Sequence, residues 1–273
     1  MLRPAVAAVL EALRAALSKV LPDGGAADAI VNETDSGLDL LLRPHKRLDL
    51  SLDRRQDLVA LAERADLARL SWGDRATAEP IVVRRPPILL LGDMPIEPPP
   101  GAFLQATKRA EQAMRLAVSE WAGDAPRVVD LFAGIGALSL GRAGKLALFE
   151  SDQPAVAAIE TARRRTADGK VSVEKRDLFR NPLTANELAA FDAVVLDPPR
   201  AGALAQSGEL ARAKVPRVVY GSCDPGSFAR DARTLQDGGY RLEKLLPIDQ
   251  FLWSPHVELI ALFARAPLRS AAT

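Results

Sequence analysis

The chain contains very little cysteine and histidine, few aromatic residues and no long hydrophobic run. Its 273 residues include one cysteine and two histidines, and aromatic residues make up 5%. A single cysteine excludes an internal disulfide, a multi-cysteine zinc site and a cysteine-ligated iron–sulfur cluster, so we expect no metal centre. No apolar run approaches the ~18 residues of a membrane-spanning helix, and residues 5–17 have the pattern of an amphipathic helix. We therefore expect a cytoplasmic protein that does not act at a membrane.

The chain also lacks an excess of charge of either sign. It has 36 Lys and Arg against 35 Asp and Glu, which gives a formal net charge of +1. No global field attracts a polyanion, so any nucleic acid must be held by local basic clusters. Four clusters are candidates for phosphate binding: Arg43–Arg47, Arg54-Arg55, Lys108-Arg109 and Arg163–Arg165. Each of them taken alone is more often a solvated surface.

Prolines are concentrated in one segment that divides the chain. Seven of the 20 prolines lie between Pro80 and Pro100, a density that excludes continuous helix and is typical of a linker or an edge strand. We therefore expect a small α+β unit over residues 1–79, a proline-rich linker over 80–100 and a larger domain over 101–273.

Two elements are predicted within the first unit. Apolar runs on either side of Asp35-Ser36-Gly37 predict a hairpin over residues 29–42. Leucines and a valine at helical spacing predict a helix over Ser51–Leu70. We find no catalytic pattern in this unit.

After Gly101 short β-branched runs alternate with helical segments, which is the pattern of a parallel sheet covered on both faces. A helix is predicted over Leu104–Trp121. Seven strands are predicted, the last two as an antiparallel pair at the edge: Val128–Phe132, Leu146–Phe149, Val171–Val173, Ala193–Leu196, Val218–Tyr220, Arg241–Leu246 and Val257–Phe263. The sequence therefore predicts an α/β, Rossmann-like domain with a mostly parallel seven-stranded sheet.

A turn with two glycines follows the first predicted strand of this domain. It reads DLFAGIG over residues 130–136, and Gly134 and Gly136 allow a tight turn and a close approach of the backbone to a ligand. The second strand ends at Glu150, where a carboxylate can accept hydrogen bonds from two ribose hydroxyls. Both features indicate a cofactor that contains adenosine.

The charges around this turn favour one kind of adenosine cofactor. The third glycine of a pyrophosphate-binding fingerprint is missing after Gly136. Asp177 and Asp197 follow the third and fourth strands and add negative charge, which repels a pyrophosphate and suits a sulfonium cation. These residues favour S-adenosylmethionine over a nicotinamide dinucleotide and leave both open.

The only thiol of the chain lies at the end of a predicted strand. The fifth strand runs into Gly221-Ser222-Cys223-Asp224-Pro225, whereas a cysteine that only fills a core is expected inside an element. The fourth strand ends at Asp197-Pro198-Pro199-Arg200, whose prolines hold Asp197 at the crevice mouth. Ligands bind at the carboxyl ends of such strands, so we interpret Cys223 as a reactive group.

Five sequence blocks between Gly101 and Phe263 resemble the RNA uracil-5-methyltransferases, which form 5-methyluridine in tRNA and ribosomal RNA. In order, they are Phe103-Leu104-Gln105, DLFAGIG at 130–136, LDPPRAG at 196–202, YGSCDPGSFARD at 220–231 and Pro255-His256-Val257-Glu258. The resemblance implies a class I methyltransferase fold, S-adenosylmethionine as cofactor and an RNA uridine as substrate. We expect a monomer.

The resemblance also implies roles for individual residues. Cys223 corresponds to the family's nucleophile and Glu258 to its general base. Gln105, Phe132, Glu150, Asp177 and Asp197 fall at the family's cofactor-site positions, beside the turn glycines Gly134 and Gly136.

The chain departs from the family pattern at several positions. Thr107, Ala137 and Asp224 stand where the family usually has asparagine, and Asp224 is expected to raise the pKa of the neighbouring thiol. The N-terminal oligonucleotide-binding barrel and the four-cysteine iron–sulfur motif of many relatives are missing. We therefore expect either a reduced relative or the C-terminal part of a longer protein.

The chemistry of uracil explains why a thiol and a base are needed. Carbon 5 is too weak a nucleophile until a thiolate adds to carbon 6, and a base must then remove the proton from carbon 5. His256 competes with Glu258 for the base role because its ordinary pKa is nearer neutrality. The amide of Gln105 could meet either the cofactor or the base.

Two other functions stay open at this point. The Asp-Pro-Pro turn is also typical of methyltransferases that act on exocyclic amines, although Arg200 replaces the usual aromatic residue and such chemistry needs no cysteine. The chain could also be a non-catalytic RNA-binding relative that keeps the fold alone.

Overall fold

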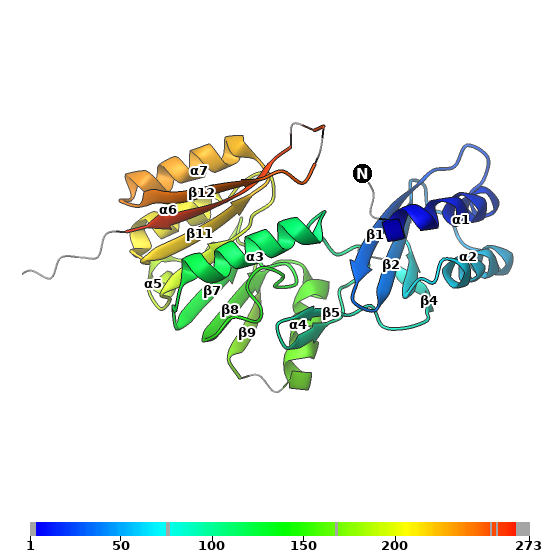
Figure 1. Ribbon diagram of the computed structural model, residues 1–273, viewed down its shortest axis with the longest axis horizontal. Helices are drawn as coiled ribbons and strands as arrows, with labels where there is room; N and C mark the ends of the chain where they lie inside the picture. Colours follow the sequence, from blue (N-terminus) through cyan, green and yellow to red (C-terminus); the bar gives the residue numbers. More distant parts are fainter. Residues whose placement is uncertain (1–3, 75–76, 167–168, 252, 255, 266–273) are drawn as a thin grey trace, which may run out of the picture. The chain divides into compact units, whose positions relative to one another are not determined.

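The protein consists of two compact units in the computed structural model, which describes residues 4–74, 77–166, 169–251, 253–254 and 256–265 (Figure 1). One unit comprises residues 1–90 and 95–103, and the other comprises residues 91–94 and 104–273. Among the helices of these described segments, none is long and apolar enough to cross a lipid bilayer.

The N-terminal unit is a four-stranded sheet with two helices. Its elements are α1 (Pro4–Val20), β1 (Ala27–Thr34), β2 (Gly37–Pro44), α2 (Leu52–Arg64), β3 (Arg69–Trp72) and β4 (Glu79–Val83). The strand order is β1-β2-β3-β4, with β2 and β3 parallel and the outer pairs antiparallel. Thr34 pairs with Gly37 across the turn, so the predicted hairpin is confirmed. Val9, Leu13 and Val20 of α1 are buried at helical spacing in the core of this unit.

The predicted helix over Ser51–Leu70 is too long. Ser51 caps α2 by accepting a hydrogen bond from the backbone N–H of Arg54, but the helix ends at Arg64. Asp66 then adopts a left-handed conformation with φ 47°, which turns the chain into β3. Leu67 and Leu70 are buried, yet Leu70 lies in β3, whose four residues are all buried, so its burial does not depend on a helical spacing.

The proline-rich segment over 80–100 contains three strands and is not a continuous linker. β4 begins at Glu79, directly before this segment, continues into it and is the edge strand of the N-terminal sheet. β5 (Leu89–Leu91) pairs with β6 (Met94–Ile96) in a separate two-stranded sheet. An edge strand has ladder hydrogen bonds on one side only, so Pro80 is tolerated in β4. The boundary between the two units therefore falls inside residues 90–104 instead of ending at residue 100.

The larger unit is built on a seven-stranded sheet in the order β12-β13-β11-β10-β7-β8-β9. Its strands are β7 (Arg127–Leu131), β8 (Lys145–Glu150), β9 (Val171–Lys175), β10 (Ala193–Leu196), β11 (Arg217–Ser222), β12 (Arg241–Ile248) and β13 (Glu258–Ala264). The first five are parallel, and β13 is antiparallel to both β11 and β12. All seven predicted strands are confirmed, as is the α/β, Rossmann-like domain with a mostly parallel sheet.

Five helices accompany this sheet: α3 (Lys108–Ala122), α4 (Gln153–Thr166), α5 (Ala185–Leu188), α6 (Leu204–Ala213) and α7 (Pro225–Asp237). The predicted helix over Leu104–Trp121 begins four residues later than expected. Thr107 is its N-cap and accepts a hydrogen bond from the backbone N–H of Ala110. Gln105 therefore lies in the extended segment before α3, and the departure at Thr107 has a structural role.

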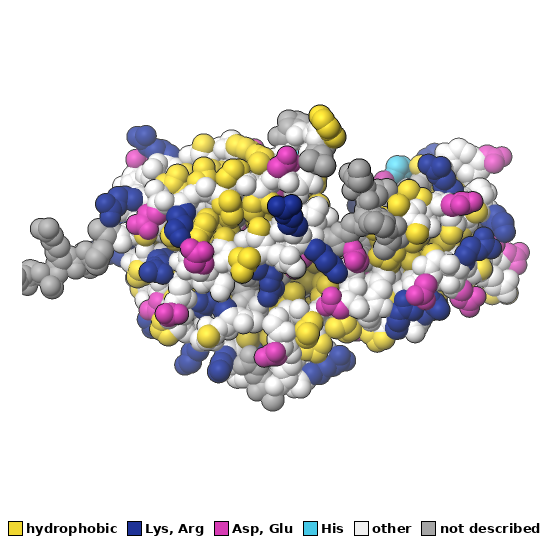
Figure 2. Space-filling model, viewed as in Figure 1, with side chains coloured by type: hydrophobic (Ala, Val, Ile, Leu, Met, Phe, Trp, Pro, Cys, Tyr) yellow, Lys and Arg dark blue, Asp and Glu magenta, His cyan; other side chains and the backbone are white. Residues whose placement is uncertain are grey.

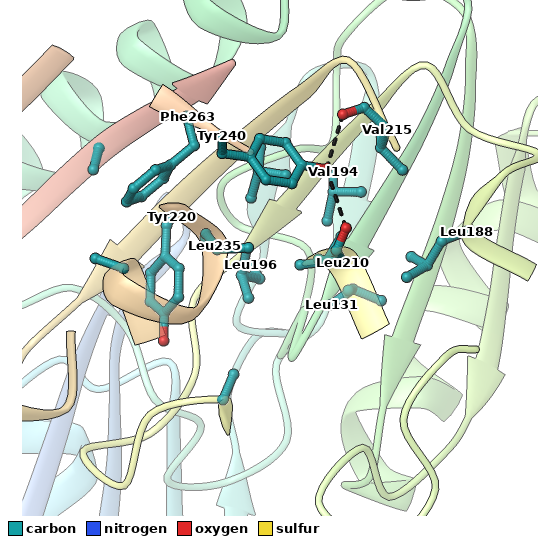
Figure 3. Close-up of a cluster of buried hydrophobic side chains, with 14 of the residues drawn as sticks. Leu131, Leu188, Val194, Leu196, Leu210, Val215, Tyr220, Leu235, Tyr240 and Phe263 are labelled. Atoms are coloured by element: carbon teal, nitrogen blue, oxygen red, sulfur yellow. Dashed lines mark hydrogen bonds between the residues drawn. The ribbon is translucent and has the colours of Figure 1, made fainter. Parts of the chain in front are cut away.

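The central strands of the sheet are buried under helices, and this packing holds their ends in place. Val194 and Leu196 of β10 and Tyr220 of β11 pack in one cluster with residues of α6 and α7 (Figure 3). Tyr240 also packs in this cluster, and its hydroxyl donates to the carbonyl oxygen of Val215 at 2.8 Å. Burial on both faces of β10 fixes its register and so holds the turn that follows it.

Candidate active site

The strand ends bring most of the predicted site residues to one edge of the sheet. The carboxyl ends of the five parallel strands lie there, and the antiparallel β13 begins there. Ser222 of β11 pairs with Leu259 of β13, so Glu258 lies beside Cys223, the residue that follows β11. Phe132, Gly134 and Gly136 follow β7, Glu150 ends β8, Asp177 follows β9 and Asp197 follows β10.

The glycine turn after β7 has an unusual backbone that begins at Phe132. The sequence predicts Phe132 as the last residue of the strand, but the strand ends at Leu131. Phe132 instead adopts φ 60°, which is rare for a bulky side chain and costs conformational energy. Gly134 and Gly136 also have positive φ, at 56° and 80°. A Cβ on Gly136 would lie 2.6 Å from Leu140, whereas a Cβ on Gly134 would meet nothing within 4 Å. Gly136 therefore serves packing, and Gly134 leaves open space above the turn.

Glu150 is held in place by backbone N–H groups. Its Oε2 accepts from Gly134 at 2.8 Å, and its Oε1 accepts from Ser151 at 2.7 Å and Asp152 at 2.8 Å. These bonds orient the carboxylate toward the glycine turn. Because a carboxylate oxygen can accept two hydrogen bonds, Oε2 can accept one more from a ligand hydroxyl.

Carboxylates crowd the crevice between β7, β8 and β10. Burial raises the pKa of Asp130 to about 7, and the negative charges of Asp197 and Glu150 add to the effect against a hydrogen bond from Ser139. Burial likewise raises the pKa of Asp197 to about 7, with a contribution from Glu258. Such mutual influence requires short separations, so these side chains form one acidic region that favours a bound cation.

Asp197 lies directly against the backbone of β11. A Cβ on Gly221 would come within 2.6 Å of Asp197 Oδ1, so only glycine permits this approach. Gly221 is two residues before Cys223. The fold therefore places the Asp-Pro-Pro turn and the thiol side by side.

Cys223 is half-buried and its thiol is less acidic than usual. Burial raises the pKa of Cys223, and the negative charges of Glu258 and Asp197 raise it further, while Arg200 opposes them. Asp224 was predicted to cause such a rise. Its carboxylate instead caps α7 by accepting from the backbone N–H of Gly226, so the predicted direction is confirmed and the predicted cause is wrong.

Glu258 is buried at the start of β13, with 4% of its surface exposed. Burial raises its pKa, and a hydrogen bond from the side chain of Gln250 opposes that rise. His256 is exposed, and its ring lies 6.4 Å from that of Phe251, centroid to centroid. Of the two competing bases, Glu258 is the one whose charge acts on the thiol. Pro255, the first residue of this sequence block, lies outside the described residues.

Gln250 is a site residue that the sequence analysis did not identify. Its Nε2 donates to Oε1 of Gln105 at 3.0 Å, and its side chain also reaches Glu258. Gln105 is therefore connected to the predicted base through Gln250. No sequence signal reveals this contact, because the two glutamines are 145 residues apart.

Asp177 lies at the far side of the crevice, after β9. Its Oδ1 accepts from the backbone N–H groups of Phe179 at 3.0 Å and Arg180 at 3.3 Å. This turn places the half-exposed ring of Phe179 5.2 Å from the ring of Phe132, centroid to centroid. The two rings form an apolar wall that the sequence analysis missed, because Phe179 belongs to no motif.

A buried carboxylate ties the Asp-Pro-Pro turn to the helix after Cys223. Asp231 of α7 accepts hydrogen bonds from the hydroxyl of Tyr220 at 2.6 Å, from the backbone N–H of Ala203 at 2.5 Å and from Nε of Arg230 at 2.9 Å. Arg230 also donates to the carbonyl oxygen of Ala201. The relative position of the turn and the thiol thus rests on a hydrogen-bond network as well as on the sheet. No group of three or more His, Cys, Asp or Glu side chains suited to a metal ion occurs in the part of the chain that the structure describes.

Comparison with known proteins gives the relatives of this chain. A sequence model of the tRNA (uracil-5-)-methyltransferase family matches residues 124–266. An uncharacterized RNA methyltransferase of Brucella suis is 43% identical over 96% of this chain and 62% of its own length. A 23S rRNA (uracil(1939)-C(5))-methyltransferase of Aeromonas salmonicida is 31% identical over 94% of this chain and 60% of its own length. The chain thus spans about three fifths of the length of these relatives.

The fold has a solved counterpart. The tRNA (uracil-54, C5)-methyltransferase of Pyrococcus abyssi, crystallised with S-adenosyl-L-homocysteine, superposes with a TM-score of 0.68. It shares 20% identity and is aligned over 93% of this chain and 66% of its own. The family match covers the glycine turn, the Asp-Pro-Pro turn, Cys223 and Glu258, and on this basis the chain belongs to the tRNA (uracil-5-)-methyltransferase family.

Proposed function

We propose that this protein transfers a methyl group from S-adenosylmethionine to carbon 5 of a uridine in RNA, through a covalent bond between Cys223 and the base. One observation carries the proposal: the only thiol of the chain lies beside a buried carboxylate, Glu258, at the ligand-binding edge of the sheet. The names of relatives that act on uracil in 23S rRNA and tRNA support the substrate class. The RNA is a ribosomal or transfer RNA.

The cofactor would bind over the glycine turn and supplies the methyl group. Glu150 offers an acceptor for a ribose hydroxyl, and Gly134 leaves room above the turn. Asp197 and Asp130 provide the negative charge that a sulfonium cation needs nearby. The complex of the Pyrococcus enzyme with S-adenosyl-L-homocysteine supports this assignment.

The protein's own groups perform the remaining steps. Cys223 gives its proton to solvent, and the sulfur of the resulting thiolate forms a bond to carbon 6 of the uracil, which makes carbon 5 nucleophilic. After carbon 5 has taken the methyl group, Glu258 removes the proton from that carbon. The electrons of the broken C–H bond restore the 5,6 double bond, and the sulfur leaves carbon 6 as a thiolate.

Two substitutions test the order of these steps. We expect Cys223→Ala to abolish methyl transfer to bulk RNA. We expect Glu258→Gln to stall after methyl transfer, with RNA still joined to the protein on a denaturing gel and in its mass spectrum, because elimination needs the proton removed first. Glu243→Gln, an exposed glutamate on β12, is the matched control and should behave as wild type.

The same assay distinguishes the alternatives. Full activity in Cys223→Ala would exclude the covalent route, and a methyl group found on an exocyclic amine would support the amine methyltransferases. If wild-type protein transfers no methyl group to any RNA, the chain is a non-catalytic relative. Mapping 5-methyluridine in ribosomal and transfer RNA, from cells with and without the gene, identifies the target.

A further inference from the structure

Exposed aromatic side chains occur in the connection between β12 and β13. Trp253 is fully exposed, and Phe251 is exposed over 36% of its surface. The other two tryptophans, Trp72 and Trp121, are 5% and 7% exposed. Trp253 also adopts φ 66°, a left-handed conformation that is unfavourable for a large side chain. In a chain with 5% aromatic residues, two exposed aromatic side chains two residues apart in one connection mark a candidate contact surface.

This connection is continuous with the candidate active site. Gln250, next to Phe251, contacts both Gln105 and Glu258, and Glu258 follows Trp253 by five residues. Five residues of chain span at most about 18 Å, so Trp253 lies within a few nucleotides of the base that Glu258 would serve. In Figure 1 the red connection extends beyond the ends of β12 and β13.

The charge of this segment selects one kind of contact. No Lys or Arg occurs from Leu245 to Ala264, while Asp249 and Glu258 are acidic. The segment therefore cannot hold phosphates by ion pairing. The flat rings of Trp253 and Phe251 can instead stack on unpaired bases, which is how single-stranded RNA binds to aromatic side chains.

We propose that Trp253 and Phe251 form a stacking platform for the RNA bases next to the target uridine. This inference rests on the proposed function, because it places the flanking bases around the uridine that Cys223 attacks. A uridine that leaves its stack exposes the faces of its neighbours. The platform would cover those faces and so hold the opened strand at the crevice.

Three measurements on the whole chain test the platform, with a short single-stranded uridine-containing RNA as the probe. Trp253→Ala should weaken RNA binding about 5- to 150-fold, the range expected when one stacked base is lost, and Trp253→Phe should recover most of it. The slope of log affinity against log salt should not change, because no phosphate contact is removed. RNA should also quench the tryptophan emission of the wild type, since the other tryptophans are buried.

The control is Leu242→Ala, which removes an exposed apolar side chain from the other end of β12, where Figure 2 shows hydrophobic side chains on the surface. We expect it to bind RNA as the wild type does. Unchanged affinity and unquenched emission in a protein that binds and methylates RNA would overturn the platform and leave the proposed function standing. A wild-type protein that binds no RNA would overturn both.

Discussion

The thiol of Cys223 lies in a negative environment that a bound cation would change. Glu258 and Asp197 raise its pKa, on top of the effect of burial. A sulfonium beside Asp197 would offset those charges, whereas the uncharged sulfur of S-adenosyl-L-homocysteine would not. We therefore expect S-adenosylmethionine to lower the pH midpoint for alkylation of Cys223 by iodoacetamide, and S-adenosyl-L-homocysteine to lower it less. Because the chain has one cysteine, its alkylation can be followed without background. Equal midpoints with both compounds would place the sulfonium away from the thiol.

Gln250 affects the base through one hydrogen bond. That bond favours the ionised carboxylate and holds the pKa of Glu258 below the value that burial alone would give. In Gln250→Leu we expect a higher pKa for Glu258, so the acidic limb of the pH–rate profile should move to higher pH. Activity should fall most at low pH, where less of the carboxylate is ionised. Gln236→Leu, an exposed glutamine on α7, provides the control. A parallel loss at every pH would instead indicate a general structural defect.

Candidate site residues could be predicted where a reactive or charged side chain directly follows a recognisable strand. The sequence predicts Cys223 and Asp197 as site residues because each follows a recognisable strand, whereas the prediction of Glu258 rests on the family resemblance. The contacts of Gln250 and Asp231 could not be predicted, because each joins residues far apart in the sequence: Gln250 with Gln105, and Asp231 with Ala203. Periodicity and motifs carry no information about such pairs.

At the scale of the element, the turn after β7 contains two glycines whose substitution by alanine should have different effects. A side chain on Gly136 would collide with Leu140 in the core, so Gly136→Ala should lower the melting temperature strongly. Gly134→Ala meets no atom but must still hold φ 56°, which costs about 1–2 kcal/mol per residue. We expect the second variant to remain folded and to bind S-adenosylmethionine more weakly, by calorimetry. Equal cofactor affinity in wild type and folded Gly134→Ala would show that the turn does not contact the ligand.

The prediction of elements succeeded for the buried sheet and failed where two patterns overlap. The five parallel strands of the larger unit are short runs with apolar residues between turn signals, and their short length favours strand over helix. The helix α2 was extended too far because Leu67 and Leu70 continue its spacing into β3. For the segment that begins at Pro80 the proline density left a linker and an edge strand open, and the structure confirms the edge strand for β4.

At the scale of the whole molecule, near neutrality of charge limits how RNA can be held. The net charge of +1 provides no long-range attraction, so affinity must come from a few phosphate contacts together with base contacts. Lys108 and Arg109, at the start of α3, lie near Gln105 in sequence and are both exposed. They are therefore the basic pair most directly connected to the candidate active site.

The dependence of RNA binding on salt should be moderate. With three or four phosphates neutralised and a slope of about −0.7 for each in single-stranded RNA, a fourfold rise in salt should weaken binding by about 20- to 50-fold. Removing two of those contacts in Lys108→Ala with Arg109→Ala should lower the slope by about 1.4 and weaken all RNA sequences alike, since phosphates carry no sequence information. Titrations at several salt concentrations measure both quantities. An unchanged slope in the double variant would show that other basic clusters make the phosphate contacts. The Arg163–Arg165 cluster at the end of α4 would then be the next to test, because it lies on the same unit as Cys223.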